Sequence, residues 1–482
     1  MLLDAKNCYH ALRTHDPRFD GRFFVGVAST RIYCRPVCTA KTPQEKNCRF
    51  FPSAAAAESA GFRPCLRCRP ELAPGNASID ASARLAQAAA GMIEDGILNE
   101  SRVDSLAARL GVSDRHLRRV FQAEFGVSPV AFAQTQRLLL AKRLLTDTAL
   151  PVTQVAMASG FGSLRRFNAL LRARYRLSPS DLRRRASAGT RLSDVLTFQL
   201  AYRPPLEWEA LLSFLDKRAI SGVEHIEDGS YLRTVCVQQA GNVHMGWIMV
   251  RPLRRKPALE LRISASLAGV VPAVLARVKR VFDLSCNPGD IVLALGALAA
   301  DRPGLRLPGA FDGFELAVRA VLGQQITVKA ARTLAGRFAA TFGKPIPTPI
   351  PSLSQTFPSV EKVAALSPSS LGEIGVIAAR ARAIVSLARA VSVDGLVLDP
   401  GADVGATLER LRALPGVGEW TAQYIGMRAL SWPDAFPHTD YGVLKAMREK
   451  DARKALARAA AWQPWRAYAV MHLWRSLETE NP

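Results

Sequence analysis

The most constraining feature of the 482-residue sequence is the uneven placement of its eight cysteines. Six of them lie within the first 70 residues, and Asp4 and Lys6 interrupt any secretory signal at the start of the chain. Clustered cysteines without a secretory signal indicate a metal site or reactive thiols rather than disulfides, and they predict a reducing, cytoplasmic location. The six are Cys8, Cys34, Cys38, Cys48, Cys65 and Cys68.

Four of these cysteines form two close pairs, Cys34 with Cys38 and Cys65 with Cys68, separated by 26 residues. Two such pairs predict one tetrahedral Zn²⁺ site per chain. A zinc ribbon that only holds a small domain together is the simpler interpretation. The chemical interpretation is that thiolates on zinc stay deprotonated and electron-rich at neutral pH. Nearby arginines would then bring a DNA phosphate against a sulfur; they are Arg31, Arg35, Arg63, Arg67 and Arg69.

Charge and composition favour a nucleic-acid partner. The 64 Lys and Arg residues exceed the 41 Asp and Glu residues by 23. An excess of this size on a folded chain predicts binding to a polyanion, with nucleic acid as the first choice and an acidic membrane surface as the second. Apolar residues make up 49% of the sequence, enough for several cores, but no apolar run reaches the roughly 20 residues that span a membrane.

Turn-rich segments and changes of hydrophobic period divide the chain into four parts. A part with short elements comes first, followed by a helical part. The third part contains strand-like segments at Thr197–Tyr202, Tyr231–Val237 and Val243–Val250, and the last part is again helical. The predicted fold class is multidomain and mainly α, with α+β parts. The predicted domains are 1–76, 81–187, 193–305 and 306–482.

The second part contains two helix-turn-helix patterns about fifty residues apart. Ser113 is the expected N-cap of the second helix in the first unit, and Ser163 has the same place in the second unit. A solvated helix face is the plainer interpretation of the charged residues after each cap, but the doubled pattern favours DNA contact. The expected contact residues are Arg115, His116, Arg118, Arg119, Arg165, Arg166 and Asn168.

The residues around the cysteine pairs resemble a known family. Ile32-Tyr33-Cys34-Arg35-Pro36-Val37-Cys38 and Gly61-Phe62-Arg63-Pro64-Cys65-Leu66-Arg67-Cys68 are similar to the amino-terminal domain of the Ada adaptive-response family. The resemblance implies that the four cysteines bind zinc and that Cys34 accepts a methyl group from a DNA methylphosphotriester, once and irreversibly. Because methylation removes one negative charge, it would weaken repulsion of DNA phosphates and change DNA affinity.

The doubled helix-turn-helix resembles the AraC-type transcription-factor domain. The segment from Phe125 to Pro129 is echoed by the segment from Tyr175 to Pro179. This resemblance implies two recognition helices in adjacent major grooves of promoter DNA and contact with the transcription machinery.

The fourth part contains Leu414-Pro415-Gly416-Val417-Gly418 between two helix-like segments. Gly416 and Gly418 let a tight hairpin present backbone N–H groups to a phosphate, which is the helix-hairpin-helix pattern. A monovalent cation is a further expected ligand of this hairpin. Asp440 lies about twenty residues later and is either a plain N-cap of the next helix or a functional carboxylate, two roles that are compatible.

The hairpin, the segment Thr439-Asp440-Tyr441 and the segment from Tyr468 to Trp474 together resemble the AlkA-type 3-methyladenine DNA glycosylase II family. The resemblance implies that Asp440 stabilises positive charge on the sugar while an alkylated purine leaves. It also places Trp420, Tyr424 and Trp474 in the base pocket.

Two further residue choices refine this expectation. Trp420 stands where strand-cleaving members of the wider superfamily carry a Schiff-base Lys, so we expect base excision without strand cleavage. Gln324 and Gln325 occupy the segment that fills the gap left by the flipped base, with Gln325 in place of an apolar wedge.

The leading hypothesis is a cytoplasmic, nucleoid-associated, monomeric protein that combines methyl acceptance, promoter binding and excision of alkylated purines. One rival is a transcription regulator with structural zinc and a glycosylase fold that only clamps DNA. A second rival keeps the enzyme and uses the helix-turn-helix units as plain duplex anchors.

Overall fold

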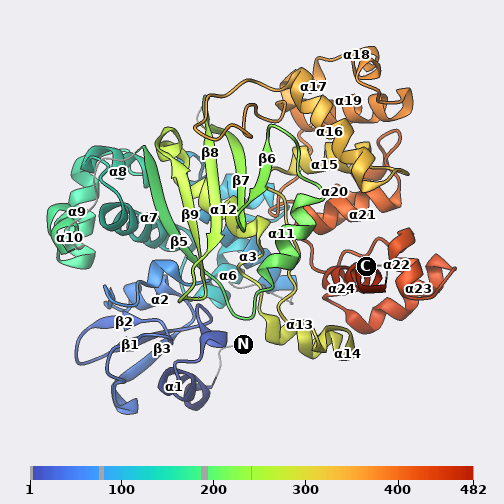
Figure 1. Ribbon diagram of the computed structural model, residues 1–482. Coiled ribbons are helices and arrows are strands. Elements are labelled where there is room, and N and C mark those ends of the chain that lie inside the picture. Colours follow the sequence, from blue (N-terminus) through green and yellow to red (C-terminus); the bar gives the residue numbers. More distant parts are fainter. Residues whose placement is uncertain (1–3, 75–80, 186–193, 240, 481–482) are drawn as a thin grey trace.

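The computed structural model describes residues 4–74, 81–185, 194–239 and 241–480. A sheet lies at the centre, with helices of residues 81–185 beside and behind it, the carboxy-terminal helices on its other side and the amino-terminal domain below (Figure 1). Within the described ranges, no helix combines the length and apolar character that crossing a bilayer requires. The predicted class, multidomain and mainly α with α+β parts, is confirmed.

The amino-terminal domain is a four-stranded sheet in the order β3-β1-β2-β4, with helix α2 packed against it. β2 runs parallel to β4, and the other pairs are antiparallel. The parallel register sets Tyr33 beside Pro64, so the cysteine pairs that follow these two strands emerge at the same end of the sheet. The elements are α1 (Ala5–Arg13), β1 (Phe24–Val27), β2 (Ile32–Cys34), β3 (Cys48–Phe51), α2 (Ala54–Ser59) and β4 (Arg63–Pro64).

Residues 81–185 contain two helix-turn-helix units joined by the long helix α7. Ser113 and Ser163 cap the second helix of each unit: each hydroxyl accepts the backbone N–H three residues later, at 3.3 and 3.4 Å. Both predicted units are present. The elements are α3 (Ala81–Glu94), α4 (Ile97–Glu100), α5 (Val103–Arg109), α6 (Asp114–Phe125), α7 (Pro129–Asp147), α8 (Val152–Ala158), α9 (Leu164–Tyr175) and α10 (Pro179–Arg185).

The central sheet has five antiparallel strands in the order β5-β9-β8-β7-β6. The sequence predicted β5, β7 and β8 but missed β6 and β9. In β9 the side chains of Leu259, Leu261 and Ile263 are fully buried, and this alternation is a signal that could have revealed the strand. The elements are β5 (Val195–Ala201), α11 (Trp208–Asp216), β6 (Glu224–Glu227), β7 (Ser230–Gln239), β8 (Asn242–Pro252), β9 (Ala258–Ser264) and α12 (Val271–Val281).

The rest of the chain is helical. α15 packs against α21, and the loop of residues 413–418 joins α20 to α21. The elements are α13 (Pro288–Leu295), α14 (Ala297–Ala300), α15 (Gly313–Leu322), α16 (Val328–Phe342), α17 (Val360–Ala364), α18 (Pro368–Glu373), α19 (Ala378–Ser392), α20 (Val404–Arg412), α21 (Glu419–Arg428), α22 (Tyr441–Ala446), α23 (Ala452–Ala459) and α24 (Arg466–Glu480).

The helix-turn-helix region and the central sheet share one hydrophobic core. Leu171 of α9 lies in the same buried cluster as Phe198 of β5 and Val274 of α12. Arg143 of α7 is buried, stacks 4.8 Å from the Phe198 ring and donates a 2.6 Å hydrogen bond to the carbonyl of Gln199. These parts therefore pack as one body rather than as domains on loose linkers.

Candidate functional site

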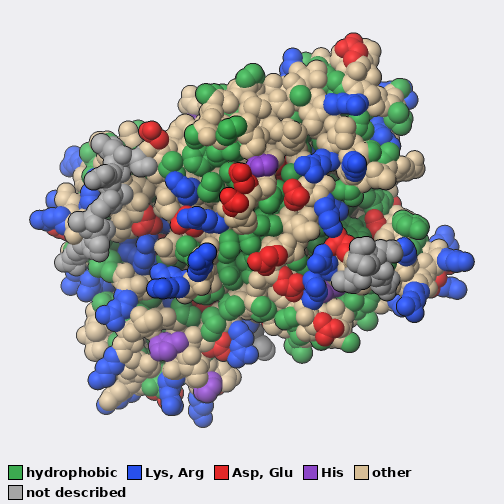
Figure 2. Space-filling view, viewed as in Figure 1, with side chains coloured by type: hydrophobic (Ala, Val, Ile, Leu, Met, Phe, Trp, Pro, Cys, Tyr) green, Lys and Arg blue, Asp and Glu red, His purple; other side chains and the backbone are tan. Residues whose placement is uncertain are grey.

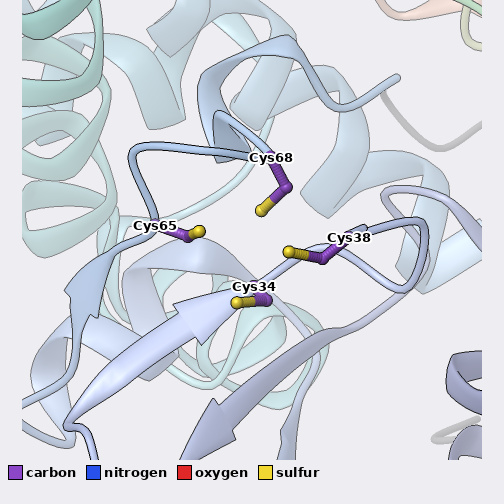
Figure 3. Close-up of side chains that lie close together, drawn as sticks. All are labelled: Cys34, Cys38, Cys65 and Cys68. Carbon is purple, nitrogen blue, oxygen red and sulfur yellow. The ribbon is translucent and has the colours of Figure 1, made fainter. Parts of the chain in front are cut away.

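Four thiols converge at the end of the amino-terminal sheet (Figure 3). Cys34 ends β2, and Cys38 follows a turn closed by its own N–H donating to the Arg35 carbonyl at 3.1 Å. Cys65 directly follows β4, and Cys68 lies three residues later. The four Sγ atoms all lie within 4.8 Å of one another. The structure thus brings together the two pairs that the sequence singled out.

The geometry and the chemistry of this donor set suit zinc. Four sulfurs about 2.3 Å from a tetrahedral Zn²⁺ lie about 3.8 Å apart, close to the size of this cluster. Hydrogen bonding to Cys34, the largest influence, and to its other neighbours holds the pKa of the Cys65 thiol well below its usual range. Hydrogen bonding to Cys34 likewise lowers the pKa of Cys38 to about 7. Hydrogen bonding to Cys38 raises the pKa of Cys34, and hydrogen bonding to Cys34 raises the pKa of Cys68, so binding of a metal would have to displace protons from these two thiols.

Backbone donors distinguish one sulfur from the other three. The Arg35 N–H donates to Sγ of Cys68 at 3.3 Å. The backbone of Ala40 donates to Cys38, and that of Cys68 donates to Cys65. In the described part of the chain, no backbone N–H donates to Sγ of Cys34. Hydrogen bonds to a ligand sulfur reduce its electron density, and Cys34 is without a donor of this backbone kind among the described residues.

Two of the five arginines expected to meet DNA are committed elsewhere, which corrects the sequence-based expectation. Arg35 is buried and forms an ion pair with Asp20, and Arg69 pairs with Glu71 and Asp147. These long-range partners could not be seen in the local sequence. The other three are Arg31 and Arg67, both exposed, and Arg63, half-buried.

The predicted contact residues of the helix-turn-helix units lie on the outward faces of α6 and α9. Five arginines are exposed, while His116 and Asn168 are half-buried. Arg118 pairs with Asp114 one turn earlier at 2.8 Å, and a guanidinium nitrogen of Arg119 lies 3.2 Å from Nδ1 of His116. In the view of Figure 2, basic side chains are spread over the whole face, including its left and lower edges, and acidic side chains are fewer. The exposed arginines are Arg115, Arg118, Arg119, Arg165 and Arg166.

The predicted hairpin lies between α20 and α21. Gly416 has a φ of +80°, the left-handed conformation that favours glycine, and Gly418 is exposed directly before α21. Gln324 joins this hairpin to the end of α15: its side-chain amide donates to the Gly416 carbonyl at 2.8 Å and to the Thr421 hydroxyl at 2.9 Å. Gln325 is exposed and holds a φ of +52°, unusual for a side chain other than glycine.

Asp440 accepts three hydrogen bonds that fix its carboxylate. The indole N–H of Trp420 donates to one oxygen at 2.8 Å, and the indole N–H of Trp474 donates to the other at 2.9 Å. The backbone N–H of Val443 donates to the second oxygen at 2.9 Å, so Asp440 is also the N-cap of α22. Both roles weighed from the sequence are thus geometrically compatible, because the cap uses the same oxygen as one indole.

Gly442 permits this arrangement and was missed by sequence reasoning. A Cβ there would lie 3.1 Å from Oδ1 of Asp440 and 3.1 Å from Cδ1 of Trp474, tighter than ordinary contact. A glycine two residues after a capping position was the available signal.

The three predicted pocket aromatics lie together beside a fourth. The rings of Trp420 and Tyr424 stack with centroids 5.3 Å apart, and Tyr424 lies 6.3 Å from Trp474. The fourth is Phe214 of α11, whose ring is nearly parallel to that of Trp474 at 6.4 Å. No local signal marked Phe214, because it lies about 200 residues before the others in the sequence.

Two arginines pack against this aromatic group, and sequence reasoning missed both. Arg218 lies 3.8 Å from the Phe214 ring centroid, and Arg428 lies 5.0 Å from it. Arg428 is buried and donates to the carbonyls of Pro308 and Gly309 at 2.8 and 3.2 Å.

Family models match four successive parts of the chain. The metal binding domain of Ada matches residues 7–71, and a helix-turn-helix domain matches 106–185. The AlkA N-terminal domain matches 197–312, and the HhH-GPD superfamily of base excision DNA repair proteins matches 318–466.

Known relatives match either almost the whole chain or a little more than half of it. A "probable bifunctional transcriptional activator/DNA repair enzyme AlkA" of Mycobacterium tuberculosis is 40% identical, covering 98% of this chain and 97% of the relative. DNA-3-methyladenine glycosylase 2 of Escherichia coli is 36% identical over 58% of this chain and 96% of its own length. A 3-methyladenine DNA glycosylase from Archaeoglobus fulgidus superposes with a TM-score of 0.50 at 19% identity, over 59% of this chain and 99% of its own, and shows the fold alone. The chain belongs to the AlkA family of bifunctional transcriptional activator/DNA repair enzymes, in which an Ada-type regulator is fused to a DNA glycosylase.

Proposed function

We propose that this protein repairs alkylated DNA in two ways and activates transcription in response to the damage. Its glycosylase part excises alkylated purines such as 3-methyladenine from double-stranded DNA, and its zinc centre accepts methyl groups from phosphotriesters. The observation that carries the excision activity is the carboxylate of Asp440, fixed by two indole N–H groups beside a set of stacked aromatic rings.

In the proposed excision, the damaged nucleotide is flipped out of the duplex and its base enters the aromatic pocket. Stacking on Trp420, Tyr424 and Trp474 contributes on the order of 1–3 kcal/mol per face to an electron-poor purine. As the glycosidic bond breaks, positive charge develops at the sugar. A carboxylate about 4 Å away stabilises this charge by about 4 kcal/mol, or roughly three decades of rate. Asp440 has that role and also orients the attacking water.

The pocket predicts a monofunctional enzyme. Trp420 carries no amine that could attack the sugar and form a Schiff base. Its indole N–H is instead directed to Asp440. Water is then the nucleophile, and the product is an abasic site in an intact strand.

The methyl-transfer proposal rests on the difference between Cys34 and the other three cysteines. Cys34 and Cys68 are half-buried, whereas Cys38 and Cys65 are buried. Of the two half-buried cysteines, Cys68 accepts a backbone hydrogen bond, whereas the sulfur of Cys34 accepts none within the described residues. Sγ of Cys34 attacks the methyl carbon, the bond from that carbon to the phosphate oxygen breaks, and the electron pair returns to the phosphate as a diester oxygen. Zinc, when bound, supplies the positive charge that keeps the four sulfurs deprotonated.

The regulatory proposal follows from the change in charge. Methylation removes one negative charge from the cluster and so weakens its repulsion of DNA phosphates. The two recognition helices then bind promoter DNA through the exposed arginines of α6 and α9 and present the protein to the transcription machinery. One chain supplies two recognition helices, so we infer that it acts as a monomer. Carbonyls of the 414–418 hairpin would hold a monovalent cation against a DNA phosphate.

These activities are tested together by incubating the full-length, zinc-loaded protein with methylated duplex DNA. We expect free methylated purines in solution, one methyl group on the protein, and a stronger promoter footprint afterwards. Release of no base while the duplex is still bound would support the non-catalytic clamp instead. An unchanged footprint after methyl transfer would contradict the regulatory half.

A further inference from the structure

The turn between β8 and β9 carries three successive cations that the functions proposed above do not use. Arg254, Arg255 and Lys256 are all exposed, and within the described residues none of them forms an ion pair. The neighbouring Arg251, in contrast, pairs with Glu260 at 2.7 Å. Adjacent like charges repel one another, and a bound polyanion relieves this repulsion. The turn is therefore suited to an anionic partner.

The backbone of this turn, residues 253–257 and here called the basic turn, is well fixed. The N–H of Leu253 donates to the Ala258 carbonyl at 2.9 Å, and the N–H of Ala258 donates to the Lys256 carbonyl at 2.7 Å. Pro252 and Pro257 flank the cations and restrict the backbone further. Little backbone freedom is then lost when a partner binds, which favours binding.

The basic turn lies beside the amino-terminal domain. The backbone N–H of Tyr202, directly after β5, donates to the carbonyl of Pro257 at 3.0 Å. The next residue, Arg203, is fully buried and reaches the amino-terminal domain, where a Cβ on Gly21 would lie 3.4 Å from Nη2 of Arg203. Residues Pro70–Leu72 of the same domain contact β5. The β5 edge of the central sheet therefore faces the domain that holds the cysteine cluster.

The contact at Gly21 leads directly to the cysteine cluster. Asp20, the residue before Gly21, forms an ion pair with Arg35, and Nη1 of Arg35 donates to the Cys68 carbonyl at 3.1 Å. The side chains of Arg203 and Arg35 thus bridge the interval between the basic turn and the sulfurs. The turn therefore lies within one helical turn of duplex DNA, about 34 Å, of the cluster.

The other turn at this end of the sheet has the opposite charge. It joins β6 to β7 through Glu227 and Asp228, which are both exposed. In the strand order β5-β9-β8-β7-β6 this acidic turn lies at the edge away from β5, whereas the basic turn lies on the β5 side. The charge thus changes sign across the end of the sheet, and the positive side adjoins the amino-terminal domain. A polyanion is directed to that side.

We propose that the basic turn binds the phosphate backbone of the duplex whose methylphosphotriester reaches Cys34. The inference rests on the proposed methyl transfer and assigns part of it to the sheet of the glycosylase part. A duplex carries one negative charge per about 1.7 Å of its axis, so DNA lying on the cysteine cluster also presents phosphates to the turn. The thiolate cluster is negatively charged and repels phosphates, and the three cations offset this repulsion.

The test replaces all three cations together, as Arg254→Gln, Arg255→Gln and Lys256→Gln, in the full-length, zinc-loaded protein. Methyl transfer from a duplex of about 30 base pairs, three helical turns, is measured at subsaturating DNA over a range of salt concentrations. At about 0.15 M salt we expect the rate to fall about 40-fold. The slope of log rate against log salt should decrease by about two, as for loss of two phosphate contacts, and the difference should vanish near about 1 M salt.

The matched control removes the same charge at the opposite side of the molecule, at and beside α23 (Figure 1). Lys450, Arg453 and Lys454 are also exposed, and in the described part of the chain they form no ion pair. The joint change Lys450→Gln, Arg453→Gln and Lys454→Gln should leave the rate and its salt slope unchanged, because charges beyond the Debye length of about 8 Å are screened.

A second measurement uses the unaltered protein. Bound duplex should protect the amine of Lys256 from an acylating reagent, as read by mass spectrometry of the digested protein. Lys256 that stays fully reactive in the complex would contradict the contact, even if the triple variant proved unstable.

The remaining outcomes separate the inference from the function on which it rests. An unchanged salt slope in the triple variant, or the same change in the control, would overturn the inference. So would an equal loss of 3-methyladenine release from a duplex without the ester, because the turn would then act through the fold or through general DNA binding. Unaltered protein that accepts no methyl group would refute the proposed methyl transfer, and the inference would fall with it.

Discussion

Cys34 and Asp440, the two proposed reactive groups, differ in how their atoms are held. Among the four clustered cysteines, Cys34 is the one whose sulfur accepts no backbone hydrogen bond from the described residues, whereas both oxygens of Asp440 accept hydrogen bonds. A nucleophile that is consumed must keep a lone pair available. A carboxylate that stabilises charge over many turnovers gains from a fixed orientation, because no reorganisation is then needed during the reaction. Hydrogen bonds to the reactive atoms are thus present at Asp440, whereas Cys34 accepts none from the backbone of the described residues.

The largest expected effect comes from removing the charge of the fixed carboxylate. Asp440→Asn should slow release of 3-methyladenine about 1000-fold, because about 4 kcal/mol of charge stabilisation is lost. Duplex binding should persist, and asparagine still caps α22. Single-turnover release and a binding titration measure the two properties.

The matched control for Asp440→Asn is Asp451→Asn. Asp451 is an exposed N-cap of α23 in the same domain, so its substitution tests capping without the proposed chemistry. If both variants lose the same fraction of activity, Asp440 contributes only as a helix cap. The proposed difference between Asp440 and Cys34 would then be wrong.

The second largest expected effect is on the pH dependence of stability, and it comes from the buried carboxyl group of Glu58. The preceding residue, Tyr33, donates to Glu58, which also accepts the hydroxyls of Thr135 and Tyr175 from the helix-turn-helix region. Burial raises the pKa of Glu58 from 4.5 to about 7. The folded state therefore holds this proton more tightly than the unfolded state, and stability falls as pH rises from about 4.5 to about 7, by about 3 kcal/mol.

Glu58→Gln should remove this pH dependence. Denaturant titrations at pH 5 and at pH 7.5 would show a smaller difference in the free energy of unfolding than in the unaltered protein. An unchanged difference would show that Glu58 does not titrate in the folded protein over this range.

A smaller effect tests how tightly the carboxylate is held. Gly442→Ala should lower kcat for base release about tenfold with little change in KM, because the new methyl group presses on Asp440 and Trp474. Gly405→Ala is the control: Gly405 also lies two residues after a capping aspartate, Asp403, but its Cβ would meet Oδ1 of that residue at an ordinary 3.5 Å. Equal rates for the two variants would argue against a strict requirement for carboxylate position.

The smallest expected effect is on DNA affinity, and it comes from an exposed arginine next to the cysteine cluster. Arg67→Gln should weaken binding to methylphosphotriester DNA modestly and reduce the slope of log affinity against log salt by about one, with zinc content unchanged. Arg13 is exposed at the end of α1, and Arg13→Gln should leave the slope unchanged. A slope that stays the same for Arg67→Gln would remove this arginine from the proposed DNA contact.

The sequence predicted the features that depend on short spacing. The cysteine pairs, the serine caps of α6 and α9, and the Gly416 hairpin each follow from residues within a few positions of one another. Asp440 and Trp420 were identified in the same way, through motifs that resemble a known family.

What the sequence did not predict depends on contacts between distant segments. The ion pair that occupies Arg35 joins positions 20 and 35, and the one that occupies Arg69 joins positions 69 and 147. Phe214 and Arg218 reach the aromatic pocket only because α11 packs beside α21 and α24, as the ring contacts with Trp474 and Arg428 show. Such pairings are set by the three-dimensional packing of the whole chain and leave no trace in local hydrophobic period or spacing.

The most direct test of the contrast is to map the methyl group on the four cysteines. Zinc-loaded protein is reacted with duplex DNA that carries methylphosphotriesters, digested, and its cysteine peptides are examined by mass spectrometry. The account predicts one added methyl group on Cys34 and none on Cys38, Cys65 or Cys68. A methyl group on any of those three, whose sulfurs accept backbone hydrogen bonds, would contradict it.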